Sequence, residues 1–209
     1  MKSKYIENPC RYSAIPLYKL DKIQDYNIVV LHDQDITNYD FENYSTHQRF
    51  FRLIHRFKNI QTNDIEGYHI RTFNLDKDIT LAVKLINNSY QDIHISELQI
   101  RAMLNSKYYY KDLWVFIVDD RTNKEVALGI CQFDDNIKEI DFDWIQVLPK
   151  YRGKGLGSML VSNLLLKSSI YGDFATVSGD LDNRFSPENL YRRCGFYGED
   201  IWHVLQKQK

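Results

Sequence analysis

A glycine-rich stretch, LPKYRGKGLGSML at 148–160, holds the residues of this chain best suited to bind an anion. It contains three glycines and the cations Lys150, Arg152 and Lys154, directly before a run with helical spacing of apolar residues. Glycines let a backbone curl closely around a ligand, and the N–H groups at a helix start point toward its charge. A pyrophosphate suits this chemistry.

Two common phosphate-binding motifs do not fit this stretch. A Walker A loop needs Ser or Thr directly after its Gly-Lys pair, and here Gly155 follows that pair. The dinucleotide pattern G-x-G-x-x-G would need a glycine at Ser158 or at Leu160, depending on the register. What remains is R-x-x-G-x-G at 152–157, between a predicted strand and a predicted helix.

Carboxylates lie on the strand that leads into the glycine-rich stretch. Glu139, Asp141 and Asp143 occupy alternate positions of EIDFDWIQV, so an extended chain points all three to one face. Ile145 and Val147 follow at the same spacing and are expected on the same side. Such acids can take a proton from an amine, recognise a cationic substrate, or form the solvated face of a hairpin strand. The residues alone leave these alternatives open.

Hydrophobic periodicity predicts the elements that position these residues. Three apolar runs at 113–120, 125–133 and 139–147 are joined by polar stretches of hairpin length, which favours an antiparallel meander. The order β-α-α-β-β-β-α-β-α-β predicts an α/β (α+β) fold with a mixed, mainly antiparallel sheet flanked by helices. The other expected strands are 67–74, 174–180 and 200–207, and the expected helices are 75–91, 96–110, 155–169 and 186–196.

Capping residues mark the ends of two of these helices. Ser96 is a plausible cap for the helix at 96–110, and Ser186 stands at the cap position before Pro187. Gly195 stands where the helix at 186–196 would stop.

The first 66 residues have a different character. A polar stretch at 59–67 that ends in glycine predicts a soft boundary, with an N-terminal extension or small lobe at 1–66 and the main domain at 67–209. A short strand is expected at 26–33. A helix is expected at 44–57, where apolar residues recur at helical spacing at Phe50, Leu53, Ile54 and Phe57.

Composition limits the classes of function. The 209 residues carry 27 basic and 28 acidic side chains, so no global field attracts nucleic acid or an anionic membrane. The three cysteines form no C-x-x-C pair, and we expect thiols rather than disulfides. No apolar run is long enough to span a bilayer, so a cytoplasmic location is expected. No spacing typical of a metal site occurs, and none is expected.

Two short motifs resemble those of the GNAT N-acetyltransferases. VLPKYRGKGLGSML looks like their acyl-CoA-binding signature, [QR]-x-x-G-x-[GA] after a strand that ends in V-x-P. NLYRRCGF looks like their second signature, a helix with leucine and tyrosine followed by G-F. One helix and one strand separate the two motifs, as in that family, and the resemblance covers roughly residues 67–209.

The resemblance implies which residues bind acetyl-CoA. Backbone groups of Ile145 and Val147 would hold the pantetheine arm, and Asn183 lies near the position of an asparagine that touches it. The pyrophosphate would be held by the amides of Arg152, Gly153, Lys154, Gly155, Leu156, Gly157 and Ser158.

The resemblance also implies catalytic residues. Tyr191 matches the tyrosine that faces the acyl-CoA sulfur in the family. Asp141 lies eleven residues before Arg152, the spacing at which several members carry a glutamate or histidine base, and Asp143 lies nearer the acyl group. For Tyr191 the alternative is simple packing of its ring in the core.

The implied activity is transfer of an acetyl group from acetyl-CoA to a primary amine by direct attack. The acceptor would be a small-molecule or peptide amine, with no nucleic acid or membrane partner, and a homodimer is compatible with the sequence. The alternative is an acyl-CoA-binding regulatory or protein-interaction module without turnover.

Overall fold

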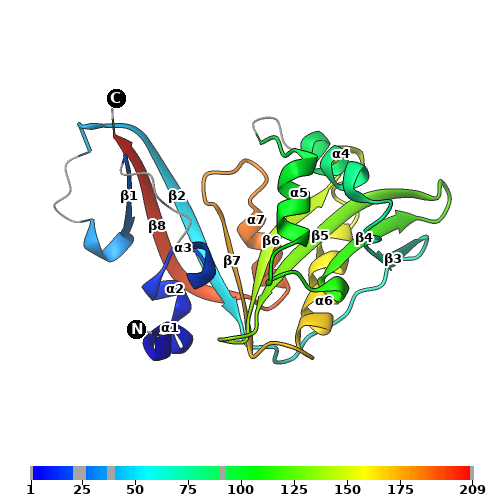
Figure 1. The fold of residues 1–209 in the computed structure, drawn as a ribbon, viewed down its shortest axis with the longest axis horizontal. Helices are drawn as coiled ribbons and strands as arrows, with labels where there is room; N and C mark the ends of the chain where they lie inside the picture. The colour runs from blue at the N-terminus through cyan, green and yellow to red at the C-terminus, as the bar shows by residue number, and fades with distance from the viewer. Residues whose placement is uncertain (1, 21–26, 37–40, 90–92, 208–209) are drawn as a thin grey trace. The chain divides into compact units, whose positions relative to one another are not determined.

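The computed structural model describes residues 2–20, 27–36, 41–89 and 93–207 (Figure 1). The chain divides into two compact units. Unit 1 comprises Met1–Arg56 and Thr176–Lys209, and unit 2 comprises Phe57–Ala175. Unit 1 is therefore built from both ends of the chain. The domain boundary predicted after residue 66 stays a prediction, because these units describe packing within the chain rather than separate domains.

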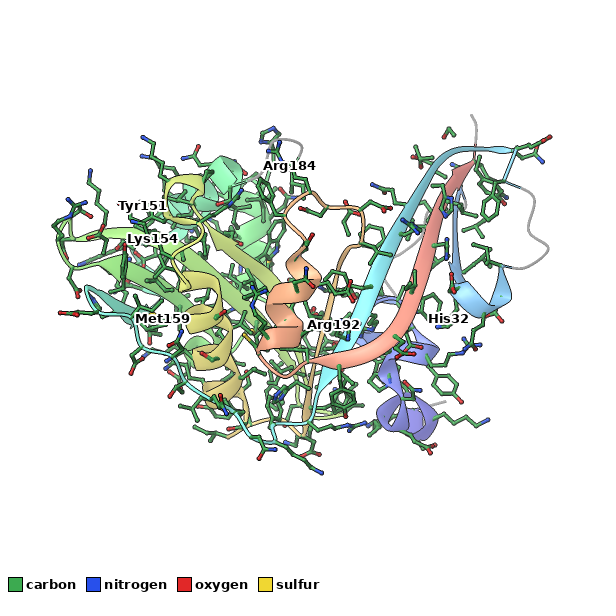
Figure 2. All side chains as sticks on the ribbon, turned by 180° about the vertical axis from the view of Figure 1, so that it is seen from behind. His32, Tyr151, Lys154, Met159, Arg184 and Arg192 are labelled. Carbon is green, nitrogen blue, oxygen red and sulfur yellow. The ribbon has the colours of Figure 1, made fainter. Side chains whose placement is uncertain are left out.

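Unit 2 contains an antiparallel meander with strand order β6-β5-β4-β3. Figures 1 and 2 together show α4 and α5 on one face of these strands and α6 on the other. We call these the α4 face and the α6 face. The elements are β3 (Tyr68–Thr72), α4 (Ile79–Ser89), α5 (Glu97–Leu104), η2 (Lys111–Leu113), β4 (Trp114–Asp119), β5 (Lys124–Asp134), β6 (Glu139–Val147), η3 (Pro149–Tyr151) and α6 (Leu156–Ser168).

Most of the elements predicted for unit 2 are confirmed, but α4 begins at Ile79 rather than at residue 75, and α5 ends at Leu104 rather than at residue 110. The three predicted meander strands pair in antiparallel register as β4, β5 and β6. The Ser96 side chain accepts a bond from the Gln99 amide, and the Gln99 side-chain oxygen accepts one from the Ser96 amide, which forms a complete capping box for α5. Strong periodicity and a local cap suffice to place these elements.

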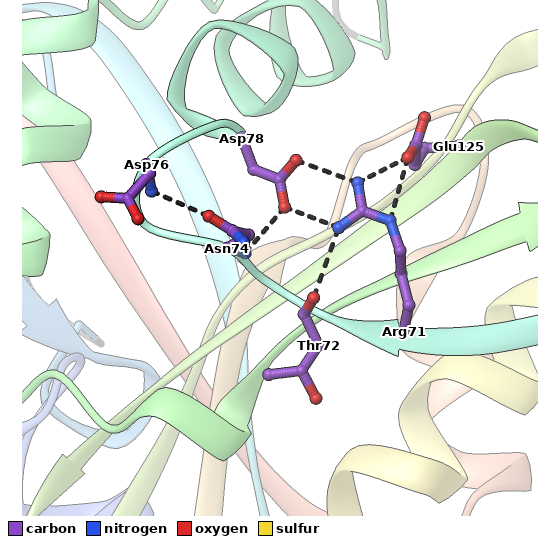
Figure 3. Close-up of polar contacts among 6 residues, drawn as sticks. All are labelled: Arg71, Thr72, Asn74, Asp76, Asp78 and Glu125. Carbon is purple, nitrogen blue, oxygen red and sulfur yellow. Dashed lines mark hydrogen bonds and ion pairs between the residues drawn. The ribbon is translucent and has the colours of Figure 1, made fainter.

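Arg71 ties β3 to the start of α4 and to β5 (Figure 3). Its guanidinium donates to both carboxylate oxygens of Asp78, at 2.6 and 3.0 Å, and its Nε donates to Glu125 at 2.9 Å. Asp78 also accepts from the Asn74 amide at 2.7 Å. Burial alone would lower the pKa of Arg71, but hydrogen bonds and charge from Asp78 and Glu125 raise it. The guanidinium is therefore a fixed charged junction between three elements.

Unit 1 has the strand order β1-β8-β2-β7, so a strand from the N-terminal part of the chain lies between two C-terminal strands. β8 pairs antiparallel with both β1 and β2. The predicted α/β fold with a mainly antiparallel sheet flanked by helices is confirmed. The elements are α1 (Lys2–Glu7), α2 (Pro9–Tyr12), α3 (Leu17–Leu20), β1 (Ile28–His32), η1 (Asp33–Asp35), β2 (Tyr44–His55), β7 (Phe174–Asp180), α7 (Pro187–Arg193) and β8 (Tyr197–Lys207).

The predicted helix at 44–57 is wrong, because Tyr44–His55 form strand β2. All five residues of 51–55 are buried. The Arg52 guanidinium donates to the Tyr5 hydroxyl of α1 at 3.0 Å, while the Phe51 ring lies 6.1 Å from the Tyr191 ring of α7. A strand covered on both faces shows no alternation, so its apolar run can imitate helical spacing.

Helix α7 begins at Pro187, and Gly195, with φ of +90°, follows its end as predicted. Ser186 precedes the helix, but its side chain makes no capping bond. Its backbone is left-handed, with φ of +45°, rather than in the extended conformation of a typical cap residue. The capping role expected for Ser186 is therefore wrong.

Gly179 of β7 lies directly against Phe51 of β2, since a Cβ at Gly179 would lie 2.5 Å from the ring Cζ. We expect Gly179→Ala to lower the free energy of unfolding by about 1–3 kcal/mol, measured by urea denaturation, because a packed ring yields only with strain. Phe51→Leu in the same background should recover part of this loss. Additive effects of the two substitutions would contradict the contact.

The His55 imidazole is buried at the end of β2, with its centroid 5.4 Å from that of Phe196. Burial lowers the pKa of His55 from 6.5, so the unfolded chain binds the proton more readily. Its contribution to stability is complete above about pH 6.5 and is lost as the pH falls toward the folded-state pKa, with a slope of at most about 1.4 kcal/mol per pH unit. His55→Gln should therefore reduce the slope of the unfolding free energy against pH between pH 7 and 5. Equal slopes for the two proteins would contradict this.

Candidate functional site

Strand β6 contains a bulge at Asp143. In the ladder with β5, Phe142 lies opposite Cys131 and Trp144 lies opposite Ile130, so β6 contains one extra residue, Asp143, at this point. An extra residue reverses the alternation of the side chains beyond it.

The bulge separates residues that were expected on one face. Asp141 lies opposite Gln132 and shares the α4 face with Glu139. Ile145 lies opposite Gly129, whose backbone packs against Leu160 and Leu164 of α6. Ile145 and Val147 therefore lie on the α6 face, and the expectation that they share a side with the acids is wrong. Glu139 and Asp141 are buried, whereas Asp143 is half-buried.

Cys131 lies next to these acids on β5. Burial raises the pKa of its thiol well above the ordinary value, and the charges of Asp141 and Asp143 raise it further. A thiol held protonated is a poor nucleophile, so Cys131 is not suited to carry an acyl group. No disulfide joins the described cysteines, as expected.

The glycine-rich stretch forms a turn that leads into α6. Gly153 and Gly155 have φ of +78° and +82°, values that favour glycine, and both are exposed. Leu156 and Gly157 begin the helix, so their N–H groups face its positive end. A Cβ at Gly155 would lie 3.1 Å from Ile65 Cδ1, which gives a second reason for glycine there.

Two of the three cations in this stretch, Arg152 and Lys154, have different environments. Arg152 points inward: its Nε donates to the Val147 carbonyl at 3.0 Å and its Nη2 to the Ser89 carbonyl, at the end of α4, at 2.7 Å. The Arg152 amide donates to Pro149. Lys154 is exposed, and its Nζ lies 3.4 Å from the Tyr68 hydroxyl and over the Tyr151 ring. Figure 2 shows Tyr151 and Lys154 on the turn and Met159 on the helix.

Unit 1 holds the remaining predicted site residues. Tyr191 is buried on α7, with its ring between Phe51 of β2 and Phe196. Asn183 is half-buried in the loop after β7, where its side-chain oxygen accepts from the Phe185 amide at 3.0 Å. The residues from Asp141 to Ser158 lie in unit 2, and Asn183 and Tyr191 lie in unit 1.

Sequence reasoning missed Arg49, which holds the loop that carries Asn183. The Leu181 amide donates to the Arg49 carbonyl at 2.8 Å, and the Arg49 Nε donates to Asp182 at 3.1 Å. No local pattern indicated this role, because it depends on β2 being a strand beside β7. Gln132 was also missed, although a single glutamine within the apolar run of β5 is a visible signal.

Within residues 2–20, 27–36, 41–89 and 93–207, no group of three or more His, Cys, Asp and Glu side chains is placed to hold a metal ion. None of the helices in those ranges has the length and apolarity needed to cross a bilayer.

Comparison with known proteins gives a family match for part of the chain and similar folds among solved structures. Residues 110–197 match the model of the acetyltransferase (GNAT) domain family. Among curated proteins, no sequence matches the chain. A GCN5-related N-acetyltransferase from Sphaerobacter thermophilus is 17% identical with a TM-score of 0.68, over 79% of this chain and 53% of that one. The chain thus spans about half the length of this relative.

Two shorter structures share the fold over most of their own length. The NatC complex bound to Gag peptide and CoA contains a chain that is 18% identical, with a TM-score of 0.56 over 68% of this chain and 99% of that one. The ribosomal-protein-S18-alanine N-acetyltransferase from Escherichia coli is 18% identical, with a TM-score of 0.54 over 68% of this chain and 95% of that one. Residues 110–197 thus match an acetyltransferase (GNAT) domain, and these solved structures share the fold of the chain.

Arg152 caps the C-terminal end of α4, so its loss should affect stability. We expect Arg152→Met to lower the free energy of unfolding by about 2 kcal/mol, because a charged donor to two carbonyls disappears. Lys150→Met, an exposed neighbour, should change it by less than about 0.5 kcal/mol in the same denaturation assay. Equal effects of both substitutions would contradict the capping role.

Proposed function

We propose that the protein transfers an acetyl group from acetyl-CoA to a primary amine. The observation that carries this proposal is the exposed turn at Gly153–Gly155, with left-handed backbone at both glycines and a helix start behind it. It lies within the segment that matches the GNAT family model. Its glycines, helix amides and lysine suit a diphosphate, so the residues present fit the cosubstrate.

Individual residues of unit 2 would hold acetyl-CoA. The amides of Gly153–Ser158 and the Lys154 charge would bind the pyrophosphate. Arg152 would support them from behind, because its own amide and guanidinium are engaged within the protein. Backbone groups of Ile145 and Val147 would hold the pantetheine arm. The family resemblance of Asn183 separately makes it a candidate for touching pantetheine.

When bound, acetyl-CoA supplies an acyl carbon activated by its thioester. The acceptor amine must lose a proton to attack, and Asp141 on the α4 face is our candidate for the group that takes it. Asp143, at the bulge, would either share this task or bind the cationic amine. Tyr191 would donate a hydrogen bond or a proton to the departing sulfur. Because Cys131 is kept protonated, direct attack by the amine is favoured over a cysteine-bound acyl group.

Binding is tested by a thermal shift with acetyl-CoA. At a hundred times its dissociation constant, the ligand should stabilise the protein by about 2.7 kcal/mol. Lys154→Ala should reduce this stabilisation at a fixed ligand concentration. Lys167→Ala removes the same charge at the other end of α6 and should leave the shift unchanged. Absence of any shift with the unmodified protein would refute the proposal.

Turnover is tested by release of the CoA thiol with a panel of amines. Tyr191→Phe and Asp141→Asn should each lower kcat by tenfold or more while acetyl-CoA still stabilises the protein. Tight acetyl-CoA binding without release of thiol on any amine would favour the alternative of a binding module. The cytoplasmic location and the homodimer stay predictions from the sequence.

A further inference from the structure

Five buried polar atoms on the α4 face of unit 2 lack a hydrogen-bond partner within the described residues. They are the Tyr109 hydroxyl, Trp114 Nε1, Gln132 Oε1 and the two amide atoms of Gln146, which lies opposite Leu128. Trp114 is 0% exposed and Gln132 is 3% exposed. Unpaired buried polar atoms destabilise a fold, and native proteins keep few of them. Several on one face of a sheet therefore indicate a ligand that completes them.

The strand register places the first three of these atoms beside the predicted catalytic acid. Trp114 lies opposite Ile130, and Gln132, two residues further along β5, lies opposite Asp141. Side chains at opposite positions of a ladder share a face and touch. The Tyr109 ring packs edge-on against the Trp114 ring, with centroids 5.5 Å apart. Tyr109, Trp114 and Gln132 thus form a row that ends at Asp141, which we call the polar row.

The unpaired atoms of the polar row define the chemistry of the missing partner. Gln132 Oε1 is an acceptor and needs an N–H or O–H group, whereas the Trp114 indole can only donate and needs an oxygen. Burial, with the charge of Asp112, raises the pKa of Tyr109, so its hydroxyl stays protonated and can do either. The buried carboxylates of Asp141 and Glu139 on the same face favour a cationic or neutral ligand over an anion.

We propose that the polar row binds the acceptor and selects an α-amino amide, meaning the N-terminus of a peptide or another aminoacyl amide. This inference rests on the proposed acetyl transfer and names its acceptor class. The amine donates to Gln132 Oε1 beside Asp141, and the neighbouring carbonyl oxygen accepts from Trp114 Nε1. A free amino acid would bring a carboxylate toward Asp141 and Glu139. A polyamine would leave the indole unpaired.

Access to the row requires a side chain to move, because all three atoms are covered in the structure. Tyr109 is half-buried and comes from the turn between α5 and η2 rather than from a strand. The backbone of Trp114 is fixed in the ladder of β4 and β5, and that of Gln132 in the ladder of β5 and β6. Tyr109 is therefore the member of the row that moves aside when the acceptor enters.

The acceptor class is tested with acetyl-CoA and three amines: alaninamide, alanine and spermidine. Release of the CoA thiol should give kcat/KM for alaninamide at least tenfold above the other two. Gln132→Met and Trp114→Phe, which remove the polar atoms and keep most of the volume, should each raise the KM for alaninamide about tenfold. Both should leave the KM for acetyl-CoA within twofold. Both substitutions should also lower the ratio of kcat/KM for alaninamide to kcat/KM for spermidine.

Ser168→Ala is the matched control. The Ser168 hydroxyl is also buried without a partner among the described residues, but it lies at the last position of α6. Ser168→Ala and Gln132→Met should each keep or raise the melting temperature, because each removes a buried polar atom. Only Gln132→Met should alter the KM for alaninamide.

Three results would overturn the inference. They are a preference for alanine or spermidine, an unchanged KM for alaninamide in both row variants, and turnover of none of the three amines by a protein that binds acetyl-CoA. Because Gln132→Met is nearly isosteric, the test does not depend on the folding of Trp114→Phe. Failure of acetyl-CoA to bind the unmodified protein would instead contradict the proposed function.

Discussion

One extra residue in β6, Asp143 at the bulge, decides which side chains of this strand share a face. Without it, Ile145 and Val147 would follow the acids onto the α4 face. With it, the acids lie under α4, and the two apolar residues next to the glycine turn lie under α6. A single strand can therefore present proton-accepting groups to one side and an apolar surface to the other. The assignment of an acceptor side in unit 2 depends on this reversal.

The N-terminal part of the chain contributes to the surroundings of Tyr191 and Asn183. Phe51 of β2 contacts the Tyr191 ring, and Arg49 of the same strand holds the loop that carries Asn183. Residues outside the matched segment 110–197 thus set the local environment of two residues inside it. Changes in β2 are expected to influence the candidate site through packing and loop position rather than through direct chemistry.

Local signals allowed much of the fold and part of the site to be predicted. The glycine turn, α6, the capping box at Ser96 and the meander each depend on residues close together in sequence. Strand β2 could not be recognised, because its buried faces are covered by elements far away in the chain. The bulge at Asp143 leaves no mark in an alternating sequence. The inward position of Arg152 depends on the end of α4, more than sixty residues earlier.

Unit 1 is built from two segments far apart in the sequence, and this has a consequence for how the chain folds. Strand β2 pairs with β8, so Phe51 and its partner Ile201 are 150 residues apart. The hairpins of unit 2 close over short loops, whereas this pairing must wait until β8 has been synthesised. Strand β2, with five consecutive residues destined for burial, is exposed while the intervening residues are translated. The nascent chain is consequently vulnerable to aggregation at β2 until β8 leaves the ribosome.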